Sequence, residues 1–159
     1  MKKLLICSTL LLAGCAATAP QEPLKAGDTF ELTGTTKAGL NVQQNYTLRG
    51  RPEYDDGDWF YTANGRAIND AVLVLSGDQD VLMLAQPTET PKDQPAGDTW
   101  YMICLALPKG PGWASAKGLL LHEREKDMSN LFKALEGEPN LSAFSNLAQK
   151  AGTCTVRRL

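Results

Sequence analysis

The chain has 159 residues, 43% of them hydrophobic and 21% charged, which suits one domain with a core of its own. Its formal net charge is −2 and it has no block of basic residues, which argues against nucleic acid as a partner. With one histidine and four cysteines, we expect no metal site, and no motif indicates a cofactor.

Residues 1–14 have the layout of a secretory signal peptide. Lys2 and Lys3 form the basic start, and an apolar stretch from Leu4 to Leu12 follows, too short to cross a bilayer as a helix. Small residues come next, as they do before a cleavage site. No other apolar run in the chain is long enough for a transmembrane helix.

The sequence Leu12-Ala13-Gly14-Cys15 resembles the lipobox of bacterial lipoproteins. The resemblance implies cleavage before Cys15, a diacylglycerol on its sulfur, and acylation of the new amine, for which palmitate is a typical chain. Several acyl chains on one residue anchor a protein stably to a membrane. We therefore expect a lipid-anchored envelope protein facing the periplasm or exterior, on the outer membrane of a diderm host because residue 16 is not Asp. The alternative is an ordinary signal peptide cut after Ala17 or Ala19.

The composition changes after the leader. Residues 15–27 are rich in Ala, Thr, Pro and Gln and predict a lipidated, flexible tether. Residues 28–159 predict a single β-rich globular domain, whose first strand alternates Phe30 and Leu32 with polar residues. In the next strand one face is apolar except at Gln44, and it is formed by Leu40, Val42, Tyr46 and Leu48.

Later strands are expected at 58–63, 71–75, 81–85, 98–107 and 113–121. The strands 71–75 and 81–85 are apolar on both faces, so we expect another part of the chain to cover their outer side. The segment 86–97 holds three prolines, which block sheet pairing and predict a surface loop.

The hydrophobic period changes to three and four near the C-terminus. Residues 128–135 and 141–151 predict two helices, and 153–157 a short closing strand. The fold class is therefore mainly β with some α. We expect an antiparallel β-meander of six or seven strands in a curled sheet or small barrel, then one or two helices and a final strand. The outline is similar to that of lipocalins, without the lipocalin signature near the first strand, and it implies no function.

Two cysteines, Cys104 and Cys154, remain after Cys7 leaves with the leader and Cys15 is acylated. An even pair in an oxidising compartment favours a disulfide, which would close a loop of about 50 residues and contribute about 4 kcal/mol. The alternative, a metal or redox pair, fits poorly because the two residues lie far apart in sequence.

Aromatic residues next to turns are the candidates for a binding surface. We name Tyr54, Trp59 and Trp113, and expect Tyr54 and Trp113 to be exposed. The alternative for these residues is packing in a β core. The acidic run 53–58 could supply oxygen ligands to calcium, but it lacks the spacing of an EF-hand, and Asp56-Gly57 is an ordinary turn pair.

His122 is the one candidate for general-base chemistry. No Ser or Cys of a recognisable nucleophile motif accompanies it, and we expect it in a surface segment that leads into the first helix. The sequence therefore predicts no catalytic residue. We expect a non-catalytic binding protein for a small apolar ligand or an envelope protein. The alternatives are a cell-surface hydrolase that uses His122 and carboxylates, or an inhibitor of hydrolases.

Overall fold

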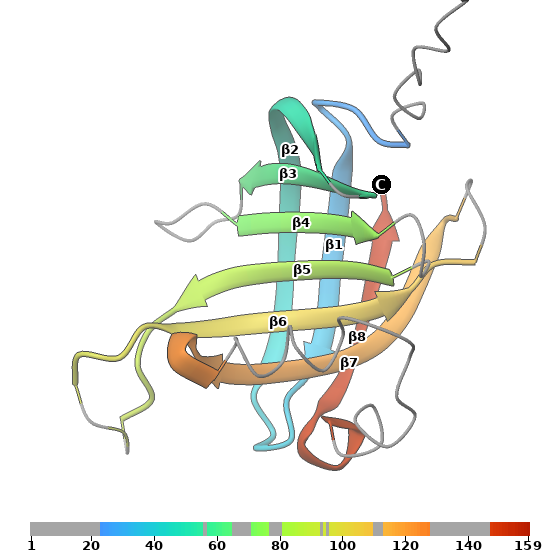
Figure 1. Ribbon diagram of the computed structural model, residues 1–159. Coiled ribbons are helices and arrows are strands. Elements are labelled where there is room, and N and C mark those ends of the chain that lie inside the picture. Colours follow the sequence, from blue (N-terminus) through green and yellow to red (C-terminus); the bar gives the residue numbers. More distant parts are fainter. Residues whose placement is uncertain are drawn as a thin grey trace, which may run out of the picture.

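The computed structural model describes residues 23–55, 57–64, 71–76, 81–92, 94, 96–109, 113–127 and 147–159. These residues form a closed barrel of eight antiparallel strands (Figure 1). The strands are β1 (Thr29–Thr35), β2 (Asn41–Asp55), β3 (Asp58–Asn64), β4 (Ala71–Ser76), β5 (Val81–Thr88), β6 (Trp100–Leu107), β7 (Ser115–Arg124) and β8 (Gly152–Arg158). The predicted mainly-β meander is confirmed, and its sheet is closed rather than open.

Each strand pairs with the next in sequence, and β8 closes the barrel between β7 and β1. The long strand β2 serves two neighbours, because its first half pairs with β1 and its second half pairs with β3. The β2–β3 register shifts between Arg49 and Glu53, so the last residues of β2 form a separate hairpin tip with the start of β3. The eight strands thus form one closed ring of pairings.

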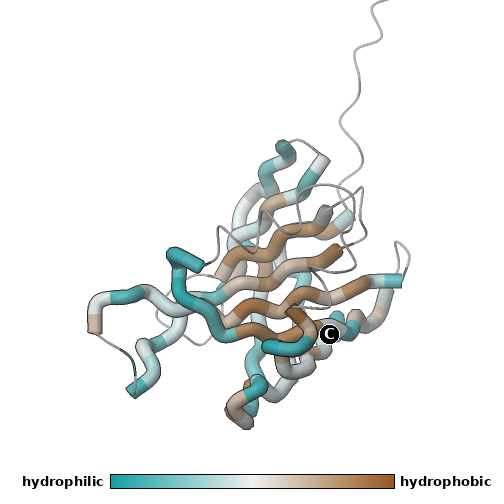
Figure 2. The backbone as a smooth tube through the Cα atoms, turned by 60° about the horizontal axis from the view of Figure 1, so that its bottom comes forward, coloured by the Kyte–Doolittle hydropathy of each residue, from teal (hydrophilic) through white to brown (hydrophobic). Residues whose placement is uncertain are grey.

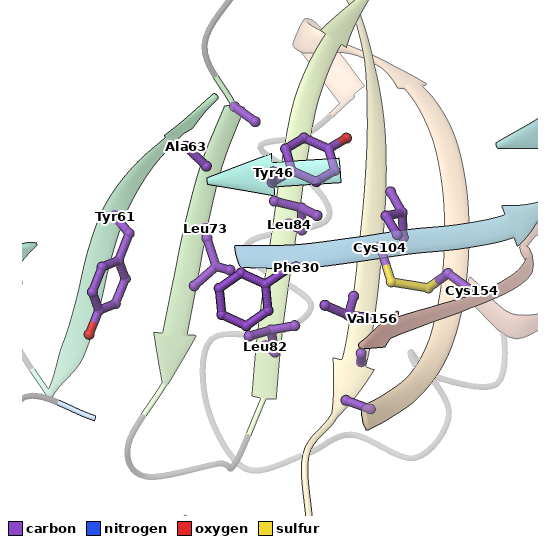
Figure 3. Close-up of a cluster of buried hydrophobic side chains, with 14 of the residues drawn as sticks. Phe30, Tyr46, Tyr61, Ala63, Leu73, Leu82, Leu84, Cys104, Cys154 and Val156 are labelled. Atoms are coloured by element: carbon purple, nitrogen blue, oxygen red, sulfur yellow. A yellow bond between two sulfur atoms is a disulfide. The ribbon is translucent and has the colours of Figure 1, made fainter. Parts of the chain in front are cut away.

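Alternate residues of every strand face the lumen and form one apolar core (Figure 3). Phe30, Leu73 and Leu82 lie at its centre and are fully buried. The aromatic ring of Tyr46 and the sulfur atoms of Cys104 and Cys154 belong to the same core. The period-two pattern in the sequence therefore marks the lumen side of the strands, as expected.

The outer face of β5, β6 and β7 is also largely apolar and buried. Met83, Ile103, Leu105 and Leu121 are at most 8% exposed, and Leu147 packs against them from the C-terminal part of the chain. The expectation that the outer side of the doubly apolar hairpin is covered is therefore confirmed for β5, whereas Val72 on the outer face of β4 is 43% exposed. Figure 2 shows the hydrophobic residues concentrated along the strands and the hydrophilic residues toward the loops.

The predicted disulfide joins Cys104 of β6 to Cys154 of β8, with their Cα atoms 6.1 Å apart. It passes the strand between them, β7, where Gly118 is the Cα partner of Cys154. A Cβ atom at Gly118 would overlap the backbone of Leu105. The absence of a side chain at this position therefore allows β6, β7 and β8 to bend together around the disulfide.

The barrel has two ends that differ in chemistry. The hairpin end carries the β2–β3 tip, residues 23–28 and Trp113, and the histidine end carries His122 and the β5–β6 loop 89–99. In Figure 1 the first described residues, in blue, lie beside the β2–β3 hairpin. Leu24 is buried in the core at 3% exposure, so the folded domain begins inside the segment expected as tether.

Two short helical segments are described, 125–127 and 147–150. Most of the two helices expected at 128–135 and 141–151 lies outside the described residues, as do the signal peptide and Cys15. Within the described ranges no helix is long and apolar enough to cross a bilayer. The expected closing strand is present as β8, one residue longer at each end.

Candidate functional site

The β2–β3 tip brings two of the three aromatic residues singled out in the sequence together. Tyr54 and Trp59 are Cα partners, and their ring centroids lie 4.9 Å apart. Trp59 also contacts Tyr61, at 6.5 Å, and packs against the core. At the turn, Gly57 has a φ of 89°, a conformation that glycine adopts without strain. The ring of Tyr54 is thus supported by Trp59, which in turn packs against Tyr61.

Aromatic surface is exposed on both faces of this tip. Tyr54 is 41% exposed on one face, and Phe60 is 37% exposed on the other. The side chains of Glu53 and Asp55 are exposed next to them. Rigid, amphipathic rings bordered by charge are typical of residues that dominate the energetics of protein interfaces.

Trp113 lies at the same end but is not part of this surface. It is only 5% exposed and stacks on Phe30 at a centroid distance of 5.7 Å. The Arg158 guanidinium lies 5.8 Å from the centre of its ring and covers it from outside. The expectation that Trp113 is exposed is therefore wrong, because the residue closes the lumen at the hairpin end.

His122 lies in β7, on a lumen-facing position, and not in a surface segment before a helix. Its Nε2 atom is 3.0 Å from the Thr88 hydroxyl, and its ring lies 5.0 Å from the Trp100 ring. Burial lowers the pKa of His122 because the low dielectric disfavours the imidazolium. The neutral ring therefore has one donor and one acceptor nitrogen.

Further polar groups continue this cluster into the lumen. The Tyr46 hydroxyl donates to Gln86 Oε1 across the barrel, from β2 to β5, and burial raises the pKa of Tyr46. Gln44 Nε2 and Trp100 Nε1 are fully buried N–H donors with no acceptor. A buried donor without an acceptor costs about 1–3 kcal/mol, so these two groups lower the stability of the folded protein.

Four charged side chains at the rim of the histidine end form ion pairs with one another: Asp98, Arg124, Lys126 and Asp127. Arg124 donates from Nε to Asp127 at 2.8 Å and lies 3.7 Å from Asp98, which also accepts from Lys126 at 3.1 Å. Burial raises the pKa of Glu123, and the nearby Asp127 adds to that shift. Arg124 is thus held by two carboxylates and is not free to bind an anion.

An open groove of about 350 Å³ crosses the outer face of β2, β1 and β8. Its side chains stand in two rows set by the strand register, and all are neutral: Thr33, Thr35, Asn41, Gln43, Thr153 and Thr155. It gathers no titratable group, so it offers hydrogen bonds but no acid–base chemistry.

Sequence reasoning did not find the polar partners of His122. The one polar residue of this end that the sequence did mark is Gln44, the single break in an apolar face, although it has no recorded contact with His122. Thr88 and Trp100 reach His122 only because β5, β6 and β7 pair in one register, which the sequence does not display. Among the described residues, no group of three His, Cys, Asp or Glu side chains is placed to hold a metal ion.

The fold and its two ends define a small, disulfide-linked, antiparallel β-barrel with an aromatic hairpin at one end and a polar lumen at the other. The chain matches no protein-family model, and no curated protein and no solved structure is significantly similar to it.

Proposed function

We propose that this protein is a lipid-anchored, non-catalytic protein of the bacterial cell envelope that binds another protein through the tip of the β2–β3 hairpin. The leader 1–14 and the lipobox ending at Cys15 support the anchor. The observation that carries the binding role is the exposed Tyr54 ring held against Trp59. Holding the ring in place in the free protein lowers the entropy cost of binding.

The charges at the tip suggest what the partner looks like. Glu53 and Asp55 flank Tyr54 in the sequence, and strand alternation places their exposed side chains on the Phe60 face of the tip. Asp58 is half-buried opposite Asp55. A partner that offers Arg or Lys side chains would meet both the carboxylates and the faces of the aromatic rings. The partner surface that fits is therefore basic, with an apolar spot for Tyr54 or Phe60.

A small apolar ligand inside the barrel fits the described lumen less well. The hairpin end is filled by side chains such as Leu24, Phe30 and Trp113, and the Tyr46–Gln86 hydrogen bond crosses the lumen farther along. An apolar ligand would have to displace packed core residues, which is costly at native packing density. This filling supports a protein partner over carriage of an apolar molecule.

A hydrolase mechanism would require a carboxylate that orients His122. The recorded partner of His122 Nε2 is the Thr88 hydroxyl, and strand alternation directs Glu123, the next residue, to the outer face. The described residues place no carboxylate in hydrogen-bonding contact with His122, so the geometry gives this alternative no further support.

Site-specific photocrosslinking in the intact envelope tests the binding role. A photoreactive phenylalanine analogue at Tyr54 or at Phe60 should form one discrete protein adduct, whereas the analogue at exposed Thr47, on the barrel wall, should not. The substitution Glu53→Lys should weaken the adduct, and Glu89→Lys, the same charge change at the histidine end, should leave it intact. Equal labelling from all three positions would refute a docking role for the hairpin.

The anchor has a separate test. Cys15→Ser should abolish acylation and release the protein from membranes, and mass spectrometry of the wild-type N-terminus should find the acyl chains on Cys15. An N-terminus at residue 18 or 20 would instead establish the ordinary signal peptide.

A further inference from the structure

The histidine end of the lumen is polar inside an otherwise apolar barrel. The lumen-facing positions of β5 change from Leu82 and Leu84 to Gln86 and Thr88 toward this end. On β2, Gln44 precedes Tyr46 by two residues. Because β2 starts at the histidine end, Gln44 lies on the same face as Tyr46 and nearer that end. Polar side chains of β2, β5, β6 and β7 thus occupy lumen-facing positions at the same end of the barrel, and ligand sites commonly use a few polar groups placed in this way.

Two of these groups have hydrogen-bonding capacity that the described structure leaves unused. Gln44 Nε2 and Trp100 Nε1 are shielded from solvent and have no acceptor. Both are donors, so what these two groups lack is an oxygen or nitrogen acceptor. A third buried atom without a partner, Asn64 Oδ1 at the end of β3, is an acceptor, but strand alternation from Ala63 in the core places it on the outer face. The two donors belong to strands on opposite sides of the barrel, β2 and β6, and both lie beyond the Tyr46–Gln86 hydrogen bond.

The charges at this end decide what kind of acceptor fits. Arg124, the described cation on a lumen-facing position here, is already held by Asp127 and Asp98. His122 is partly buried against Thr88 and Trp100, an environment that favours its neutral form. A carboxylate or phosphate entering this space would lose its hydration without gaining a counter-ion. An uncharged acceptor has no such cost.

We propose that the histidine end of the lumen is a binding site for an uncharged small molecule with a carbonyl or amide oxygen, which accepts hydrogen bonds from Gln44 and Trp100. Thr88 and His122 can both donate and accept, and they suit a second polar group on the same molecule. The site lies at the end opposite the hairpin, so it stands or falls independently of the proposed protein partner.

Nuclear magnetic resonance on the full chain in detergent micelles tests this site with benzamide as the probe and benzoate as its charged counterpart. The three tryptophans give three indole N–H signals under ¹⁵N-Trp labelling, and Trp100→Phe assigns one of them. Benzamide should move the Trp100 signal at millimolar concentrations, and benzoate should need at least about tenfold more. The Trp59 and Trp113 signals serve as internal controls for non-specific effects.

A matched pair of glutamine variants completes the test. Gln44→Leu should weaken benzamide binding by about tenfold, because one donor is lost. Gln43→Leu, at the exposed neighbouring position, should bind benzamide like the wild type. A Trp100 signal that does not move with benzamide would mean that water alone satisfies the donors, and the proposal would be wrong. Equal binding of benzoate and benzamide, or unchanged binding in Gln44→Leu, would also overturn it.

Discussion

His122 is the residue at which sequence and structure differ most. In the sequence it stands next to Glu123 and Glu125 and suggests a charged surface segment, yet it faces the lumen and bonds to Thr88. The hydrophobic period does not mark it, because a polar residue at the mouth of a barrel is compatible with either face of a strand. Burial lowers the pKa of His122, and the stability of the fold therefore depends on the pH at which this residue takes up a proton.

The pKa of His122 is lowered in the folded protein from about 6.5, so acid should destabilise the fold. The unfolded chain binds the proton more readily, and stability that is complete above about pH 6.5 falls as the pH drops toward the folded pKa. We expect the urea midpoint to fall between about pH 7.5 and about pH 5.5. The variant His122→Gln keeps a hydrogen-bonding side chain but does not titrate in this range, so its urea midpoint should fall by less over the same change in pH.

The pKa shifts of Glu123 and Glu31 affect stability in ways that can be distinguished from the effect of His122. The raised pKa of Glu123 acts in the opposite direction, because its folded form takes up a proton more readily as the pH falls. The hydrogen bond from Arg157 lowers the pKa of Glu31, so Glu31 loses its contribution only below about pH 4.5. An unchanged acid dependence in His122→Gln would contradict the assignment.

Gly118 is a second single residue on which the stability of the barrel depends. Its missing side chain lets the backbone of Leu105 approach β7, so Gly118→Ala should destabilise the protein by about 1–3 kcal/mol or more. Ser115→Ala, at an exposed position of the same strand, is the control and should stay within about 0.5 kcal/mol of the wild type. Urea unfolding at neutral pH measures both, and a stability of Gly118→Ala equal to that of the control would refute the close packing.

At the level of elements, the disulfide joins the two strands that flank β7. It closes a loop with a sequence separation of 50, so its removal should cost about 4 kcal/mol in the chain-entropy account. The double variant Cys104→Ala/Cys154→Ala should have a correspondingly lower free energy of unfolding. The wild type under reducing conditions should approach the variant, and an unaffected midpoint in both would mean that the bond contributes nothing.

The sequence predicted the elements whose side chains alternate cleanly. Phe30 and Leu32 in β1, and the doubly apolar pair β4 and β5, follow from period two and from length alone. The sequence could not show that β2 continues through its register shift to Asp55, because pairing with β3 replaces pairing with β1 partway along. The burial of Trp113 was equally hidden, since it depends on contact with Phe30 of the first strand.

The aromatic pair at the hairpin tip was partly predictable. Tyr54 and Trp59 stand on either side of a turn signal, Asp56-Gly57, which places them opposite each other in a hairpin. The contacts of His122 with Thr88 and Trp100 were not predictable in the same way, because they depend on the register in which β5, β6 and β7 pair. Local turn chemistry is visible in a sequence, whereas the contents of a barrel lumen depend on closure and register.

At the scale of the whole molecule, the proposed anchor would fix the orientation of the barrel. Leu24 is buried at the hairpin end and lies only nine positions after Cys15 in the sequence. An extended chain spans at most about 3.5 Å per residue, so the hairpin end would stay within about 30 Å of the lipid. The histidine end would then lie farther from the membrane on average, while the hairpin would meet partners close to the bilayer.

This orientation can be measured with single fluorescent labels on the lipidated protein in vesicles. Cys104 and Cys154 are joined and Cys15 would be acylated, so a new cysteine offers a unique thiol. Quenchers on the lipid chains should reduce emission from Asp55→Cys, at the hairpin tip, more than from Leu40→Cys, exposed in the loop before β2 at the opposite end. The tether attaches at the hairpin end, so this end should lie nearer the bilayer on average, and stronger quenching at residue 40 would show that another contact sets the orientation.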